Sequence, residues 1–90
     1  MAKSNHQRVK RAFAVAVTAA TNLRHAKADH VTVVSQGKRG QFSCRYELGA
    51  AVVMGTAWHN GDPRIFDVMV RSIRNTPHLR HQLFVPSVVT

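Results

Sequence analysis

Hydrophobic residues recur at helical spacing in the first quarter of the chain. Residues three and four apart share one side of a helix, so this pattern predicts an amphipathic helix over residues 4–27. Ser4 and Gln7 fit the capping pattern that opens such a helix. Residues 13–17 also alternate as a strand would, but the length of the whole segment favours a helix. The apolar positions on the predicted face are Val9, Phe13, Ala16, Val17, Ala20 and Leu23.

Strict alternation replaces helical spacing in residues 41–48. Apolar and polar side chains take turns along this segment, which is typical of a strand with one buried side. The valine-rich residues 30–36 precede it, and the connecting residues 37–40 begin and end with glycine. Glycine adopts the positive φ of a tight turn without strain, so the two segments predict an antiparallel hairpin. The apolar set is Phe42, Cys44, Tyr46 and Leu48, and the polar set is Gln41, Ser43, Arg45 and Glu47.

A third strand is the interpretation of residues 50–58. These residues are apolar and include several β-branched side chains. Gly55 lies inside the segment and weakens the pattern, because glycine lowers strand propensity. Residues 59–61 then predict a turn.

Asp62 and Pro63 predict the start of a second helix. Aspartate is a favoured N-cap residue, and proline suits the first helical position. Pro77 would end or kink this helix, and a further short helix is expected to run through residue 84. The apolar stripe of the predicted second helix is Ile65, Phe66, Met69, Val70 and Ile73.

Together these elements predict a single small α+β domain over residues 1–90. It comprises an N-terminal helix, an antiparallel sheet of two or three strands, and a C-terminal helix or pair of short helices. Residues 85–90, interrupted by Pro86, are expected to form a tail or an edge strand. The hydrophobic content of 44% supports a folded core and argues against disorder.

The charge balance narrows the class of partner. The 90 residues include 13 Lys and Arg but only 4 Asp and Glu, which gives a formal net charge of +9. A positive field of this size attracts nucleic acid, an anionic membrane or an acidic protein surface. The longest apolar stretch, residues 12–20, is shorter than the about 20 residues that a bilayer span needs. The first helix also has apolar partners within the chain, so no membrane association is expected.

Cysteine use and the N-terminal residues bear on the compartment. Cys44 is the single cysteine and has no partner for an internal disulfide, which is typical of a reducing cytosol. No small-residue cleavage site follows the apolar run, so no signal peptide is expected. We therefore expect a cytoplasmic protein, located in the host cytoplasm if it is viral.

The cationic residues fall into three clusters that suit contacts with phosphates or with an acidic partner. One is in the opening turns of the first helix, one is at the hairpin tip, and one is on the polar side of the predicted second helix. For each cluster the alternative is a solvated surface without a partner. The clusters are Arg8, Lys10 and Arg11; Lys38 and Arg39; and Arg64, Arg71 and Arg74.

Among the aromatic residues, Trp58 is the one that partial exposure would suit best, because it lies beside a predicted turn. Core packing is the favoured interpretation, and the alternative is that Trp58 stacks on a base or anchors a protein contact. The other five aromatic residues are expected in the core. They are Phe13, Phe42, Tyr46, Phe66 and Phe84.

The sequence has few residues arranged for catalysis or for metal binding. His78 and His81 share a helical spacing, but the other histidines show no spacing that would complete a zinc site. Cys44 alternates with core residues and is expected to be a buried small hydrophobe. The sequence contains no phosphate-binding loop and no dinucleotide fingerprint. We therefore expect no enzymatic activity, no metal and no cofactor.

The leading hypothesis is a non-enzymatic protein that contacts nucleic-acid phosphates with little sequence specificity. The alternative is a small phage-type inhibitor or adaptor that binds a host polymerase, nuclease or defence complex by direct protein contact. Its partner would be acidic or bound to nucleic acid. A component of a larger nucleoprotein particle is a third hypothesis. The sequence permits a homodimer and does not require one.

Overall fold

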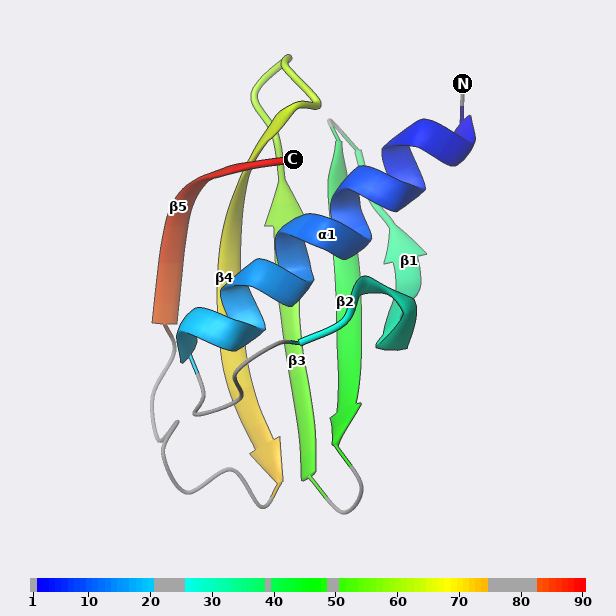
Figure 1. Cartoon of the computed structure of the whole chain (residues 1–90). Coiled ribbons are helices and arrows are strands. Elements are labelled where there is room, and N and C mark those ends of the chain that lie inside the picture. The colour runs from blue at the N-terminus through cyan, green and yellow to red at the C-terminus, as the bar shows by residue number, and fades with distance from the viewer. Residues whose placement is uncertain (1, 21–25, 39, 49–50, 75–82) are drawn as a thin grey trace.

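A computed structural model of the chain shows a five-stranded antiparallel sheet crossed on one face by a single long helix (Figure 1). The strands follow one another in the sheet as they do in the sequence, in the order β1-β2-β3-β4-β5. The elements are α1 (Ala2–Ala20), the short 3-10 helix η1 (Ala28–His30), β1 (Val31–Gln36), β2 (Gln41–Leu48), β3 (Ala51–Trp58), β4 (Ile65–Arg74) and β5 (Leu83–Val89).

The structure describes most, but not all, of the chain. Backbone is described for residues 2–20, 26–38, 40–48, 51–74 and 83–90. Side chains are described for residues 6–20, 26–38, 40–47, 52–71 and 83–90. Within these ranges no helix is long and apolar enough to cross a bilayer.

The predicted C-terminal helix is wrong, and the sheet has five strands instead of two or three. The residues assigned to that helix form β4, and residues 83 and 84 belong to β5. The predicted break at Pro77 lies outside the described residues. The first helix, the hairpin and the third strand are confirmed, although α1 runs from Ala2 to Ala20 and residues 26 and 27, predicted as its end, are not helical. Ser4 therefore lies inside the helix and not at its cap.

The Asp62-Pro63 signal marks a β-turn in this chain. The Ile65 N–H donates to the Asp62 carbonyl oxygen at 3.1 Å, and the Arg64 N–H donates to the Asp62 carboxylate at 3.0 Å. Aspartate and proline at the first two positions suit a β-turn as well as a helix start, so the signal is shared. The residues that follow favour a strand, because buried side chains alternate with less buried ones. The buried set is Phe66, Val68 and Val70, and the other is Asp67, Met69 and Arg71.

The core lies between the inner side of α1 and one face of the sheet, which we call the covered face. Phe13 of α1 and Phe66 of β4 are its largest fully buried side chains. Burial of apolar area contributes about 25 cal/mol per Å², so this layer is the main source of stability. The buried residues are Val9, Ala12, Phe13, Ala14, Ala16 and Val17 of α1, and Val31, Phe42, Cys44, Tyr46, Val53, Ala57, Phe66, Val68, Val70 and Val88 of the strands.

Gly55 on β3 allows α1 to approach the sheet closely. A Cβ atom at this position would lie 2.7 Å from Cε1 of Phe13 and would collide with the carbonyl oxygen of Met69. Gly55 weakens the strand pattern of the sequence, and this close packing explains why a glycine is present there. A residue without a side chain lies where the phenylalanine ring of the helix meets the sheet.

Two side-chain hydroxyls fix the connection from α1 to β1. The Thr18 hydroxyl donates to the Ala14 carbonyl oxygen and accepts from the Ala26 N–H, both at 3.0 Å. The Tyr46 hydroxyl, on β2, accepts from the Lys27 N–H at 3.0 Å. These bonds direct the chain from the end of the helix toward η1, which leads into the edge strand β1.

The C-terminal residues form the other edge of the sheet. Residues 85–89, expected as a tail or an edge strand, belong to β5. The pairing of β5 with β4 is interrupted once, and Pro86 lies at this interruption, where its lack of an N–H disturbs no ladder bond. Next to it, Ser87 has a φ of 54° and its N–H donates to Asp67 Oδ1 at 2.9 Å.

Candidate binding face of the sheet

The face of the sheet opposite α1 carries a different set of side chains. Directly paired residues of antiparallel strands place their side chains on the same face. The residues that alternate with the core therefore form three rows across the strands, and we call this surface the open face. The rows are Gln41, Trp58 and Asp67; Ser43, Thr56, Met69 and Phe84; and Thr32, Arg45, Met54 and Arg71.

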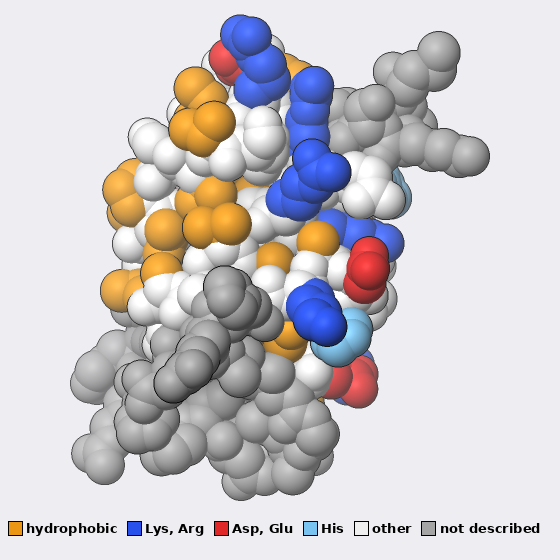
Figure 2. Space-filling model, viewed as in Figure 1, with side chains coloured by type: hydrophobic (Ala, Val, Ile, Leu, Met, Phe, Trp, Pro, Cys, Tyr) orange, Lys and Arg blue, Asp and Glu red, His pale blue; other side chains and the backbone are white. Residues whose placement is uncertain are grey.

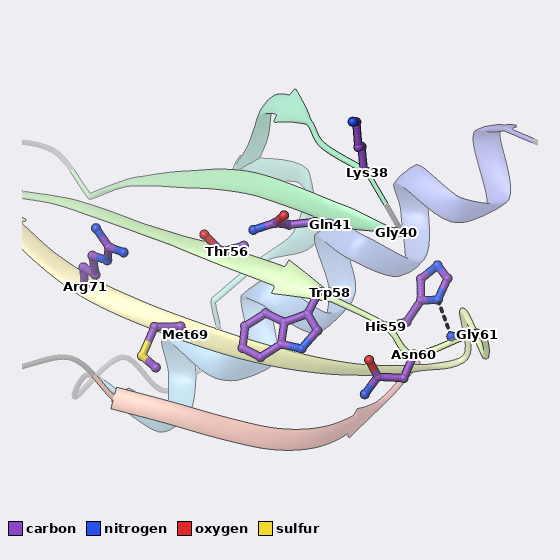
Figure 3. Close-up of a pocket in the computed structure, with 10 residues that line it drawn as sticks. All are labelled: Lys38, Gly40, Gln41, Thr56, Trp58, His59, Asn60, Gly61, Met69 and Arg71. Carbon is purple, nitrogen blue, oxygen red and sulfur yellow. Dashed lines mark hydrogen bonds between the residues drawn. The ribbon is translucent and has the colours of Figure 1, made fainter.

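Two aromatic rings from different strands stack on the open face. The ring centroids of Trp58 and Phe84 are 5.9 Å apart, with an angle of 23° between the ring planes. Trp58 comes from β3 and Phe84 from β5, so the indole reaches across β4, next to Met69 (Figure 3). Phe84 is 46% exposed and Trp58 is half-buried. Trp58 is therefore not a core residue, and the alternative of partial exposure holds instead.

A shallow depression that opens to solvent lies beside these rings. Lys38, from the turn between β1 and β2, and Arg71, from β4, both line it together with Trp58 (Figure 3). Gln41 and Thr56 add an amide and a hydroxyl to its wall. The strand pairing therefore brings together three predicted site residues from three separate segments of the sequence.

The acids of the open face already have partners. Glu47 pairs with Arg45 at 3.1 Å, and the Asp67 carboxylate accepts the Ser87 N–H. Within the described part of the chain, neither Lys38 nor Arg71 has a carboxylate within ion-pair distance. Both side chains are exposed. The depression thus presents two positive charges that no described acid neutralises.

The first predicted cluster lies on the other side of the molecule. Arg8, Lys10 and Arg11 belong to α1, which packs on the covered face. Arg11 is exposed, whereas Arg8 and Lys10 are half-buried. Figure 2 shows Lys and Arg side chains in a line across this side, with hydrophobic side chains gathered toward β5. These cations and those of the open face do not form one surface.

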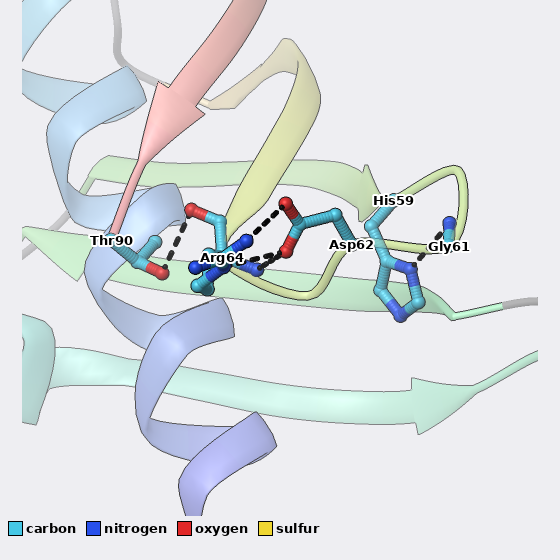
Figure 4. Close-up of polar contacts among 5 residues, drawn as sticks. All are labelled: His59, Gly61, Asp62, Arg64 and Thr90. Carbon is cyan, nitrogen blue, oxygen red and sulfur yellow. Dashed lines mark hydrogen bonds and ion pairs between the residues drawn. The ribbon is translucent and has the colours of Figure 1, made fainter.

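Arg64 is held in an ion pair at the start of β4 (Figure 4). Its Nε donates to Asp62 Oδ1 at 3.0 Å and its Nη2 donates to Oδ2 at 3.2 Å. These bonds, the Arg64 N–H bond and the charges of Arg64 and Arg8 lower the pKa of Asp62. Both partners are exposed, so the pair contributes little stability. Arg64 and Arg71 do not share a helix face, because the predicted helix is a turn and a strand.

Several residues considered for binding a partner or a metal have side chains outside the described part of the chain. Arg39 lies outside the described residues, and Arg74 ends β4 with its side chain outside them. His78 and His81 lie outside them as well. Among the described residues, no three His, Cys, Asp or Glu side chains gather as metal ligands would. The expectation that the protein holds no metal stays a prediction.

Cys44 lies on the covered face, as predicted, and is 0% exposed. Burial raises the pKa of its thiol from 9.0 to about 12, because the thiolate would lose its solvation. The thiol is therefore protonated at neutral pH. It points away from the open face and acts as a core side chain.

Most members of the open face are not among the residues that the sequence predicts to bind a partner. Phe84 was expected in the core, Met69 on the buried stripe of a helix, and Arg45 was not singled out. Of the five aromatic residues predicted to be buried, four are in the core and Phe84 is not. The alternation of residues 66–71 was the available signal, because it separates Met69 and Arg71 from the buried positions.

Comparisons with known proteins add no relative. No protein-family model, curated protein or solved structure gives a significant match to this chain.

Proposed function

We propose that this protein binds nucleic acid through its open face and has little sequence specificity. The observation that carries this proposal is the pair of exposed cations, Lys38 and Arg71, that line one depression without a described acidic partner. They belong to a chain with a net charge of +9. Lysine and arginine that neutralise phosphates release counterions, which drives binding regardless of sequence.

Each side chain has a distinct part in this proposal. The guanidinium of Arg71 offers a planar fork that matches two phosphate oxygens, whereas Lys38 offers a point charge on a flexible stem. Gln41 and Thr56 line the same depression, and their side chains can donate hydrogen bonds to the nucleic-acid backbone or to base edges. The cations of α1 add to the positive field that steers a polyanion toward the protein.

A salt series with a labelled oligonucleotide tests the proposal. The logarithm of the binding constant should fall by about 0.7 per neutralised phosphate on single strands, for each unit in the logarithm of salt concentration. The variant Arg71→Ala should weaken binding and reduce this slope by about one. Arg64→Ala is the matched control, since Arg64 is already paired with Asp62 and should matter less.

Two results would contradict nucleic-acid binding through phosphate contacts, and a third would contradict the open face as its site. One is a lack of binding to any DNA or RNA at the lowest salt concentration. The other is binding that does not change with salt, because it would show that phosphate contacts contribute nothing. If Arg64→Ala and Arg71→Ala weakened binding equally, the contact surface would not be the open face.

A second candidate is the inhibitor or adaptor that binds a protein complex. The exposed apolar side chains of the edge strand β5 favour it, because exposed apolar and aromatic residues are typical of protein contact sites. These residues are Leu83, Phe84 and Val89. A pull-down from a nuclease-treated lysate separates the candidates. Partners that survive the nuclease support protein binding, and partners that disappear support nucleic-acid binding.

A further inference from the structure

Phosphate contacts do not explain the stacked rings of the open face. The indole of Trp58 lies across β4 on the side of the sheet away from α1 (Figure 3). Phe84 stacks on it at 5.9 Å, and Met69 lies between their strands and pairs directly with Phe84. We call Trp58, Met69 and Phe84 the ring platform. It exposes apolar area on a face where the other described side chains are mostly polar.

The ring platform adjoins the two cations of the depression. Arg71 follows Met69 by two positions on β4, a separation of about 7 Å along a strand. Lys38 lies on the β1–β2 turn and lines the same depression as Trp58. A ligand that complements this surface needs flat apolar groups and negative charges a short distance apart.

Unpaired nucleotides have both properties. Each base has a flat face and each is attached to a phosphate, so aromatic stacking and backbone neutralisation act together on single strands. In a duplex the faces of the bases are covered by their neighbours in the stack, and the protein can reach only edges and phosphates. The charges of the open face therefore suit either form, whereas the ring platform suits only unpaired bases.

We propose that the open face selects single-stranded nucleic acid, with unpaired bases stacked on the ring platform and phosphates held by Lys38 and Arg71. This inference rests on the proposed function and names its substrate class. Stacking on aromatic side chains tolerates any base, since every base has a π-face. Selection therefore acts on strandedness and not on sequence.

Trp58 is the single tryptophan of the chain, so its fluorescence reports on the ring platform alone. We would titrate the protein with a short oligothymidylate, with a duplex of the same length, and with inorganic polyphosphate, which has phosphates but no bases. The oligothymidylate should quench the fluorescence and bind about 10-fold more tightly than the duplex. Polyphosphate should bind with salt dependence and leave the fluorescence nearly unchanged.

Variants measured with a labelled oligonucleotide separate stacking from charge. Trp58→Ala should lower single-strand affinity about 10-fold and leave the salt slope unchanged. Trp58→Phe, which keeps a ring, should retain most of the affinity. Phe84→Leu provides a second test of the ring platform if Trp58→Ala does not fold. Thermal unfolding of each variant checks that the fold is intact.

The outcomes distinguish this inference from the proposed function. Equal affinity for the duplex and the single strand, with unchanged fluorescence and no effect of Trp58→Ala, would overturn the inference and leave phosphate binding standing. No binding to any of the three ligands at low salt would overturn both. A protein partner that survives nuclease and is lost with Trp58→Ala would also overturn the inference, because the ring platform would then be a protein contact.

Discussion

The two faces of one sheet differ in burial, because alternate residues of the same strands lie on opposite sides. On the covered face, Val53 and Val68 are fully buried against α1. On the open face, the same strands carry Trp58, Met69 and Arg71, which line a solvent-facing depression. Neighbouring residues in the chain therefore lie in different surroundings, one set in the core and the other facing solvent. Substitutions on the covered face should change the free energy of unfolding, and substitutions on the open face should change affinity.

The largest expected difference is between two phenylalanines on opposite faces. Phe66→Ala should lower the free energy of unfolding by about 3–5 kcal/mol, because it leaves a cavity in the core. Phe84→Ala should lower it by less than about 1 kcal/mol, since the ring is 46% exposed. Chemical denaturation measures both. Equal losses would show that the open face is part of the stabilising core.

Gly55 tests how closely α1 approaches the covered face. Gly55→Ala should destabilise the protein by about 3 kcal/mol, because the added Cβ would overlap the Met69 carbonyl oxygen and crowd Phe13. Gly37→Ala is the control, since an added Cβ would meet no atom closer than 3.4 Å. Its effect in the same denaturation experiment should be below about 0.5 kcal/mol. A Gly55→Ala protein as stable as the control would contradict the packing of Phe13 on β3.

Burial of Cys44 should make the stability of the protein depend on pH in the alkaline range. The pKa of the thiol rises from 9.0 to about 12 on burial, so above pH 9 the folded chain keeps a proton that the unfolded chain has lost. Stability should therefore fall as the pH rises through this window and be unaffected by this group below it. The difference between the native protein and Cys44→Ala in pH-dependent denaturation isolates the effect. An identical pH dependence in both proteins would show that the thiol is not buried.

The smallest effect is expected at the turn between β3 and β4. Hydrogen bonds from Arg64 lower the pKa of Asp62 below its ordinary 3.8. The pair therefore contributes stability above that value, and the contribution is lost as the pH falls through the lower pKa of the folded state. An NMR titration of the Asp62 carboxyl group measures the shift. In Arg64→Ala its midpoint should return toward the ordinary value, and an unchanged midpoint would mean that the pair does not form in solution.

Local pattern was enough to predict α1, β1, β2 and β3, and it failed at β4 and at the start of β5. Helical spacing indicates α1, alternation indicates β2, and runs of valine and other apolar residues indicate β1 and β3. Residues 65–73 fit both periods, since Ile65, Phe66, Met69, Val70 and Ile73 form a helical stripe while Phe66, Val68 and Val70 alternate. Asp62 and Pro63 are typical of a helix start, which points to the helix. The same two residues are also typical of a β-turn, so they do not decide between the two structures.

The open face was predictable only in part. Lys38, Trp58 and Arg71 were each named from local features, namely a turn between glycines, an aromatic residue beside a turn, and an unbalanced cation. Their meeting depends on the pairing of Met54 with Arg71 and of Gln41 with Trp58. These contacts join segments far apart in the chain, and no local periodicity encodes them. The ring platform depends in the same way on the pairing of β5 with β4.

Chemical-shift mapping with a single-stranded oligonucleotide tests the separation of the two faces most directly. If the oligonucleotide binds the open face, the largest changes should occur at Thr56, Trp58, Met69 and Arg71, including the indole N–H of Trp58, with small changes on the covered face. Changes confined to Arg8 and Arg11 of α1 would contradict this prediction, because the nucleic acid would then bind on the helix side of the molecule.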